Sequence, residues 1–71
     1  MVEIPNSSVH RIIRKSGVNR VSKSAIIALQ KELEEYGLNI SKIARDISLY
    51  TGKKTLDEDD IKLAIWKYKQ N

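Results

Sequence analysis

The 71-residue sequence contains no cysteine and no phenylalanine, and it has only one histidine, one proline and one tryptophan. Without cysteine there is no disulfide to stabilise a small fold and no thiolate for a metal site. His10 alone cannot supply an HExxH motif, and the sequence has neither a Ser/His/Asp pattern nor a phosphate-binding loop. We therefore expect no enzymatic activity, no cofactor, no metal site and no small-molecule substrate, with His10 facing solvent.

Long apolar runs are also missing. No segment approaches the roughly 18 uninterrupted apolar residues of a membrane span, and the N-terminus lacks the apolar region of an export signal. We expect a cytoplasmic protein that contacts no membrane. A chain of this length has room for one domain, which would bury about 60% of its unfolded surface and be marginally stable alone. A partner chain is the expected source of added stability.

What the sequence does contain is one long apolar stripe. Its members recur at alternating intervals of three and four residues, so they share one face of a single helix. Ser22 is a suitable N-cap, and Gly52 fits the left-handed position that closes a helix. We expect one helix over residues 22–50, although Gly37 leaves open a break into two helices. The stripe consists of Ile26, Leu29, Leu33, Tyr36, Ile40, Ile43, Ile47 and Tyr50.

The predicted helix is longer than the protein that should contain it. It would be roughly 43 Å long at about 1.5 Å per residue, whereas a globule of this size has a diameter of about 29 Å. Because the rest of the chain cannot cover both ends, we expect an obligate dimer or half of a heterodimer. The expected dimer interface consists of Leu29, Leu33, Tyr36, Ile40 and Ile43.

Two shorter helices flank the long one, and no strand pattern is present. The first is expected from about Ser7 to Ser16, with Asn6 or Ser7 as its cap and Gly17 after its end. The third should start at a capping box in which Thr55 is the N-cap and Glu58 lies three residues later. The inward residues of the two helices are expected to be Val9, Ile12 and Ile13 in the first and Ile61, Ala64, Ile65 and Tyr68 in the third.

Four consecutive acids, residues 57–60, fall in the first turn of the third helix. Carboxylates there complement the positive end of the helix dipole. An EF-hand loop would need a glycine and a final glutamate that this segment lacks. We interpret the acids as structural rather than as metal ligands.

The basic residues cluster where phosphates could bind. The formal net charge is +4, and Arg20 and Lys23 flank the start of the long helix as Lys53 and Lys54 flank the start of the third. Cations beside the free N–H groups of a helix N-terminus form an anion site. In an antiparallel dimer the first loop of one chain would lie beside the second loop of the other. Between these composite ends would lie the bases of the first helix, Arg11, Arg14 and Lys15. The alternative is a set of ordinary solvated side chains.

Five segments occur in an order and spacing that is specific when taken together. They are residues 11–15 (RIIRK), 17–22 (GVNRVS), 33–37 (LEEYG), 52–55 (GKKT) and 60–65 (DIKLAI). Through them the chain resembles the archaeal histones over essentially its whole length. The resemblance implies an all-α histone fold of short, long and short helices, as one domain over residues 1–71, interlocked head-to-tail in a dimer. It also implies a protein that binds, bends and compacts double-stranded DNA with little sequence specificity, associated with the chromosome (nucleoid).

The resemblance assigns roles to four residues. Arg11 matches an arginine that reaches into the minor groove. Arg20 matches a first-loop arginine that enters the groove and is held in place by a threonine of the second loop, here Thr55. Lys54 matches a phosphate-binding lysine of the second loop.

Two positions depart from the family pattern. Lys53 replaces an arginine that pairs with an aspartate, here Asp60, and lysine lacks the bidentate fork of arginine. Tyr50 replaces a histidine through which dimers stack. The residues implied for such a dimer–dimer interface are Ile47, Tyr50, Asp60 and Leu63.

Three functions compete at this stage. The preferred one is a homodimeric histone that packages DNA. The second is a histone-fold subunit of a transcription or repair complex, acting mainly through a protein partner. Whether the partner in the dimer is a second copy or another histone-fold chain stays open. The third is a helical scaffold that binds no nucleic acid.

Overall fold

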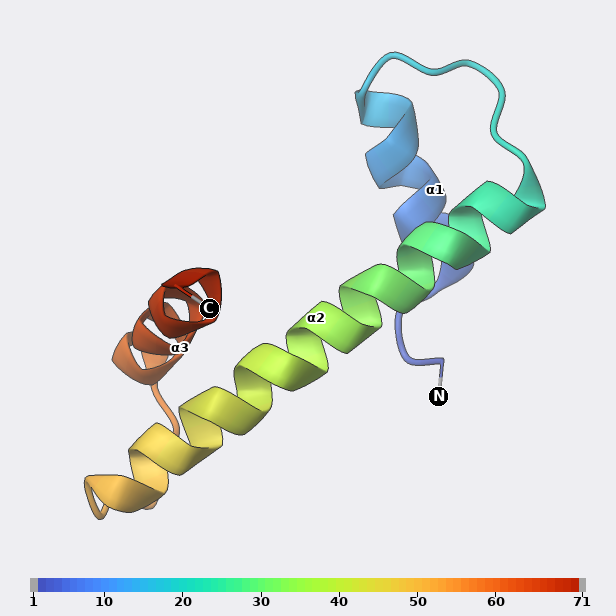
Figure 1. The fold of residues 1–71 in the computed structure, drawn as a ribbon. Coiled ribbons are helices and arrows are strands. Elements are labelled where there is room, and N and C mark those ends of the chain that lie inside the picture. Colours follow the sequence, from blue (N-terminus) through green and yellow to red (C-terminus); the bar gives the residue numbers. More distant parts are fainter. Residues whose placement is uncertain (1, 71) are drawn as a thin grey trace. The chain divides into compact units, whose positions relative to one another are not determined.

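The computed structural model describes residues 2–70, which form three helices and no strand. Helix α1 spans Asn6–Lys15, α2 spans Lys23–Tyr50 and α3 spans Glu58–Gln70 (Figure 1). The predicted all-α class and the short, long, short order are confirmed. The chain divides into two compact units, Met1–Glu35 and Tyr36–Asn71, and α2 contributes to both.

Helix α1 ends as predicted but begins differently. After Ser16, Gly17 takes a φ of 103° and donates its N–H to the carbonyl of Arg14 at 3.0 Å. The predicted cap at Asn6 or Ser7 is wrong, because Pro5 holds the N-cap position and no side chain caps the helix. Asn6 is already helical, and its Oδ1 accepts a hydrogen bond from Gln30 instead.

Helix α2 runs unbroken through Gly37, so the alternative of two helices is wrong. The Oγ of Ser22 accepts a hydrogen bond from the backbone N–H of Ala25 at 3.1 Å, which confirms the predicted cap. At the other end Gly52 has a φ of 76°, and the N–H of Lys53 donates to the carbonyl of Ser48 at 3.0 Å. This six-residue closure is typical of a Schellman motif, which requires a left-handed residue after the helix.

Helix α3 has a capping box, but not between the predicted residues. The box of Thr55 and Glu58 is wrong, because the reciprocal hydrogen bonds join Asp57 and Asp60. The N–H of Asp60 donates to Oδ1 of Asp57 at 3.1 Å, and the N–H of Asp57 donates to Oδ2 of Asp60 at 3.0 Å. Both pairs have a suitable spacing of three residues, so spacing alone could not choose between them. The four acids do lie at the helix N-terminus, where two of them satisfy backbone N–H groups.

The unit Met1–Glu35 is held by polar contacts more than by an apolar core. Val9 is its fully buried hydrophobic residue, whereas Ile12 on the same helix is 53% exposed. The side chain of Gln30, itself buried, donates to the carbonyl of Ile4 at 2.5 Å and to Oδ1 of Asn6 at 2.7 Å. Glu34 accepts hydrogen bonds from the N–H groups of Ile4 and Glu3. Gln30 and Glu34 with residues 3–6 are called the N-terminal strap below.

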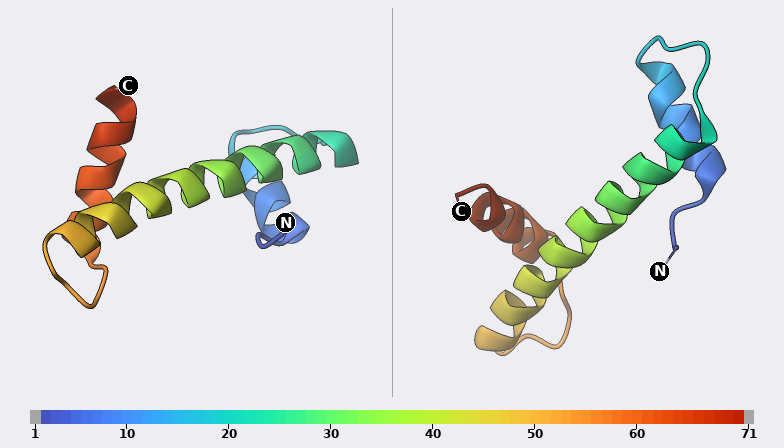
Figure 2. Two further views of the ribbon diagram at one scale, coloured as in Figure 1. Left: turned by 60° about the horizontal axis from the view of Figure 1, so that its bottom comes forward. Right: turned by 45° about the vertical axis from the view of Figure 1, so that its right-hand side comes forward.

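The unit Tyr36–Asn71 has a small apolar core made by residues of α2 and α3. Figure 2 shows α3 beside the C-terminal half of α2. Its buried members are Ile40, Ala44 and Ala64. The ring of Tyr36 meets that of Tyr68 edge-on, with centroids 5.4 Å apart and planes at 85°. Such T-shaped pairs are favoured by the aromatic quadrupole. Half-buried residues around the core are Ile43, Ile47, Ile61 and Ile65.

Much of the apolar stripe is left uncovered within one chain. Of its eight members only Ile40 is buried, while Tyr36 is 39% and Tyr50 93% exposed. Leu63 and Trp66 of α3 are also exposed. Exposed apolar surface on this scale is typical of a chain whose core is completed by another chain. None of the helices in residues 2–70 has the length and apolar character to cross a membrane.

Candidate nucleic-acid interface

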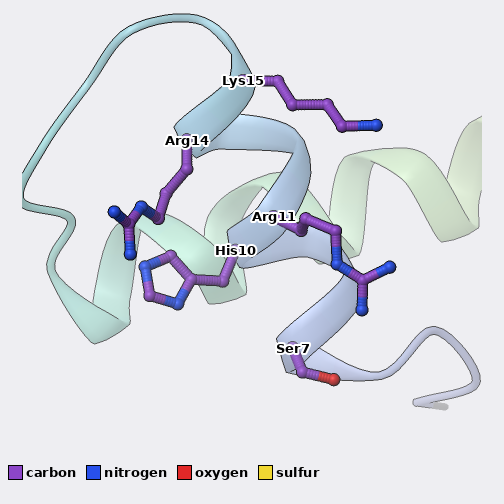
Figure 3. Close-up of a pocket in the computed structure, with 5 residues that line it drawn as sticks. All are labelled: Ser7, His10, Arg11, Arg14 and Lys15. Carbon is purple, nitrogen blue, oxygen red and sulfur yellow. The ribbon is translucent and has the colours of Figure 1, made fainter.

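The first cluster of predicted DNA-binding residues lies on one face of α1. A shallow hollow of about 410 Å³ is lined there by Arg11, Arg14 and Lys15 together with Ser7 and His10 (Figure 3). These five residues form the α1 basic face. In Figure 3 the side chains of His10 and Arg14 extend to one side of the helix, and those of Arg11 and Lys15 to the other. The structure thus brings together the three predicted cations of the first helix.

Ser7 and His10 belong to this face although the sequence analysis did not select them. His10 is half-buried rather than open to solvent, so its predicted position is only partly correct. Both side chains are hydrogen-bond donors that suit phosphate oxygens. Their signal in the sequence was spacing, since positions 7, 10, 11, 14 and 15 recur at helical intervals of three and four.

The first loop carries Arg20 and Lys23 at the start of α2. Both are exposed, and within residues 2–70 neither forms an ion pair with a carboxylate. Ser22 satisfies one N–H group of the α2 N-terminus. Two unpaired cations beside the positive end of a 28-residue helix favour binding of an anion there.

In the second loop, Lys53 is engaged inside the protein. Its ammonium group lies 3.1 Å from Oδ2 of Asp57 and 3.2 Å from Oδ1 of Asp60. The contact with Asp60 is the one that the resemblance implied. These hydrogen bonds raise the pKa of Lys53, with Asp57 as the larger cause. The N–H of Asp60 and then the ammonium group of Lys53 lower the pKa of Asp57. We call Lys53, Asp57 and Asp60 the second-loop brace.

Lys54 and Thr55 follow the brace and are exposed. Lys54 lies at the edge of a second hollow of about 190 Å³, the second-loop hollow, and within the described residues it forms no ion pair. Arg45 also lines this hollow, and the sequence analysis did not select it. In the sequence Arg45 lies three and four residues before Ser48 and Leu49, so the three side chains share one face of α2. This spacing points to a site only once the second loop is known to lie beside that face. The lining residues are Arg45, Ser48, Leu49, Lys53, Lys54 and Leu56.

Three of the four residues expected between dimers share one groove. Ile47, Tyr50 and Leu63 line a space of about 570 Å³, whereas Asp60 does not line it. The side chain of Asp60 is 3% exposed, and its two oxygens bind Lys53 and the N–H of Asp57. A hydrogen bond from Tyr50 to Asp60 would therefore have to displace part of the brace. The residues expected within the dimer are, in one chain, buried (Ile40), half-buried (Leu29, Leu33, Ile43) or exposed (Tyr36).

Comparison with known proteins finds relatives among the archaeal histones. The family described as histone-like transcription factor (CBF/NF-Y) and archaeal histone matches residues 2–65. One subunit of the archaeal histone HAN1 of Thermococcus zilligii is 40% identical over 65 residues, which cover 92% of this chain and 97% of the relative. Probable archaeal histone 3 of Methanocaldococcus jannaschii is 34% identical over the same shares of both chains.

The helix order, the basic surfaces and these relatives agree. The family match covers far more than half of the chain, and it includes α1, α2 and the first half of α3. The chain therefore belongs to the family of histone-like transcription factors and archaeal histones, and it is a DNA-binding chromatin protein of the histone type.

Proposed function

We propose that the chain packages DNA: as a dimer it binds, bends and compacts double-stranded DNA with little sequence specificity, without catalysing a reaction. The observation that carries this proposal is the α1 basic face, where three cations and two neutral donors share one surface. Cations of this kind bind the phosphate backbone, which is the same in every sequence. The exposed cations of the loops, Arg20, Lys23 and Lys54, extend the proposed surface, with Thr55 beside them.

The dimer is proposed from the uncovered stripe. Each chain would form one histone-fold domain over residues 1–71 and pair head-to-tail with another, burying Leu29, Leu33, Tyr36 and Ile43 against the equivalent helix. A homodimer is the first expectation. A heterodimer is the second, because one relative is named as a subunit. In either form we expect the protein to be associated with the chromosome in the cytoplasm.

Salt dependence of DNA binding tests the proposal. Affinity for duplexes of unrelated sequence should be similar, and log affinity should fall against log salt with a slope of about −0.9 per phosphate neutralised. Arg11→Ala, Arg20→Ala and Lys54→Ala should each weaken binding to all sequences by similar factors, whereas Lys31→Ala on α2 serves as a control of equal charge. Binding that is insensitive to salt, or confined to one sequence, would contradict the proposal and favour the transcription-complex alternative.

Bending and dimerisation need separate measurements. Bending a short duplex costs several kcal/mol by elastic estimates, so it needs simultaneous anchorage at α1 and at the loops. Energy transfer between the ends of a duplex of about 30 bp, three inward-facing minor grooves, should rise on binding, and less so with Arg11→Ala. Sedimentation should give a dimer whose melting temperature falls on hundredfold dilution. Straight DNA at saturation would contradict bending, and a folded monomer would contradict the dimer.

A further inference from the structure

The second-loop hollow contains three cations, but they are not equally available to a ligand. Lys53 and Lys54 come from the loop, and Arg45 comes from the last two turns of α2. The sequence predicted Lys53 and Lys54 as the phosphate-binding pair. The contacts that these cations make inside the protein favour another phosphate-binding pair, Arg45 and Lys54.

Lys53 is committed to the second-loop brace. One of its two partners, Asp60, has a side chain that is only 3% exposed. If Lys53 moved to a phosphate, Asp60 would remain buried without its cation, and an uncompensated buried charge is costly. The brace also carries two carboxylates and one ammonium group, so its net charge is −1 and it repels a phosphate rather than attracting one.

Arg45 is held far less firmly. Its ion-pair partner is Asp46, the next residue along the helix, with the guanidinium nitrogen 3.0 Å from Oδ1. Both side chains are largely exposed, at 60% and 69%, and an ion pair of this kind contributes little in water. Asp46 does not line the hollow, whereas Arg45 does. A phosphate in the hollow can therefore replace Asp46 at low cost.

The guanidinium group is also the better phosphate ligand. Its planar fork donates two parallel hydrogen bonds to phosphate oxygens, which an ammonium group cannot do. Lys54 supplies a second cation to the same hollow and has no carboxylate partner among the described residues. Together they offer two positive charges beside a brace of net charge −1.

We propose that Arg45 and Lys54 form the phosphate-binding pair of the second loop, and that Lys53 is a positioning residue that fixes the loop to α3. The ligand is a phosphodiester of the DNA backbone, so this inference rests on the proposed function. It replaces one predicted DNA contact, Lys53, by a residue that the sequence did not indicate.

The test compares two glutamine variants that remove the same charge. Arg45→Gln changes the hollow, and Lys42→Gln removes an exposed cation from the same helix outside it. Binding of the full-length protein to a random-sequence duplex is measured between about 50 and 200 mM salt, the range over which counterion release is large. Arg45→Gln should reduce the steepness of the salt slope by about 0.9 for each phosphate that is no longer neutralised, or about 1.8 per dimer. It should weaken binding about tenfold, whereas Lys42→Gln should have a much smaller effect.

A second pair of variants separates binding from positioning. Lys54→Gln should act like Arg45→Gln and leave the melting temperature unchanged. Lys53→Gln should lower the melting temperature, and Lys53→Arg should restore it, because arginine can keep both aspartate contacts. Well below the melting temperature, Lys53→Gln should change the salt slope no more than Lys42→Gln does.

Each alternative gives a different result. Equal losses from Arg45→Gln and Lys42→Gln, with normal binding by the unchanged protein, would overturn the role of Arg45 alone. The same role would be overturned if Arg45→Gln dissociated the dimer in sedimentation and left the salt slope intact. A slope reduced by Lys53→Gln without loss of stability would make Lys53 the ligand. Absent or salt-insensitive binding by the unchanged protein would contradict both this inference and the proposed function.

Discussion

The two units of the chain are stabilised by different means. In Met1–Glu35 one hydrophobic residue, Val9, is fully buried, and side chains of α2 hold the N-terminal segment through the strap of hydrogen bonds. In Tyr36–Asn71 an apolar cluster joins α2 and α3, and the ion pairs of Lys53 with Asp57 and Asp60 fix the second loop. Hydrogen bonds are directional, and those accepted by the carboxylate of Glu34 also depend on its protonation. Burial of apolar surface is not directional and does not depend on protonation.

This difference bears on the two basic surfaces. The α1 basic face depends on the strap, because Gln30 binds Asn6 at the start of the helix that carries Arg11. The second-loop hollow depends on the brace, since Lys53 lies next to Lys54. Two surfaces that are expected to bind the same ligand should therefore fail under different conditions.

The largest effect should come from a charge in the centre of the stripe. Ile40→Asp places a carboxylate in the apolar core and should abolish folding, whereas Lys42→Asp at an exposed site nearby should not. Leu33→Asp should also abolish folding, although Leu33 is only half-buried in one chain, because the second chain is expected to cover it. Far-UV circular dichroism measures the helix content. A folded Leu33→Asp variant would contradict the proposed dimer interface.

The second effect should break the N-terminal strap. Gln30→Ala leaves the carbonyl of Ile4 and Oδ1 of Asn6 without their donor and should cost about 1–3 kcal/mol. The melting temperature should fall by about 4–8 °C for each kcal/mol. Lys31→Ala, at the exposed neighbouring position, is the control. An unchanged melting temperature in Gln30→Ala would show that the strap contributes nothing.

The third prediction concerns the effect of pH on the stability of the two units. The N–H groups of Ile4 and then Glu3 lower the pKa of Glu34, and Asp57 in the other unit also has a lowered pKa. A lowered carboxyl pKa gives stability above the usual value, 4.5 for Glu34 and 3.8 for Asp57, that is lost as the pH falls through the folded pKa. Acid should therefore weaken both units.

Alkali should weaken only the unit that contains the brace. The pKa of Lys53 is raised, so its contribution is complete below the usual value of 10.5 and is lost as the pH rises through the folded pKa. Denaturant titrations below and above pH 10.5, followed by the fluorescence of Trp66 in α3, should show a lower free energy of unfolding at the higher pH. Lys53→Gln should remove the alkaline change and also reduce the acidic change of its own unit, because Lys53 lowers the pKa of Asp57. Glu34→Gln should reduce the acidic change of the unit Met1–Glu35. An alkaline loss that persists in Lys53→Gln would contradict this assignment.

The smallest effect is expected at the end of the stripe. Tyr50 is 93% exposed, so Tyr50→Ala should change the free energy of unfolding by no more than about 0.5 kcal/mol. Any role of Tyr50 should appear instead in assembly on DNA, as a changed length of nuclease protection. Tyr50→His is the informative variant, because it restores the residue that the family pattern has at this position. A large loss of stability in Tyr50→Ala would place this ring in the core of the dimer.

The sequence by itself determined the helices and most of their ends. Ser22 caps α2, and Gly17 and Gly52 close α1 and α2, because each of these signals acts on backbone groups within a few residues. The stripe predicted α2 across Gly37 for a similar reason, since its period measures a single helix. The resemblance to archaeal histones also came from contiguous segments, and it supplied the pairing of Lys53 with Asp60.

Tertiary structure alone decided the polar contacts that the sequence assigned wrongly or did not indicate. Two capping boxes of equal spacing were available for α3, and the one that forms contains Asp57 and Asp60, both bound by Lys53. Asn6 was expected to cap α1, but its side chain meets Gln30, 24 residues away in the sequence. Arg45 enters the candidate site only because the second loop folds back beside it. The contact of Asn6 with Gln30 joins residues that are distant in sequence, and no local pattern specifies it. The two boxes of α3 are both local, and their equal spacing could not choose between them.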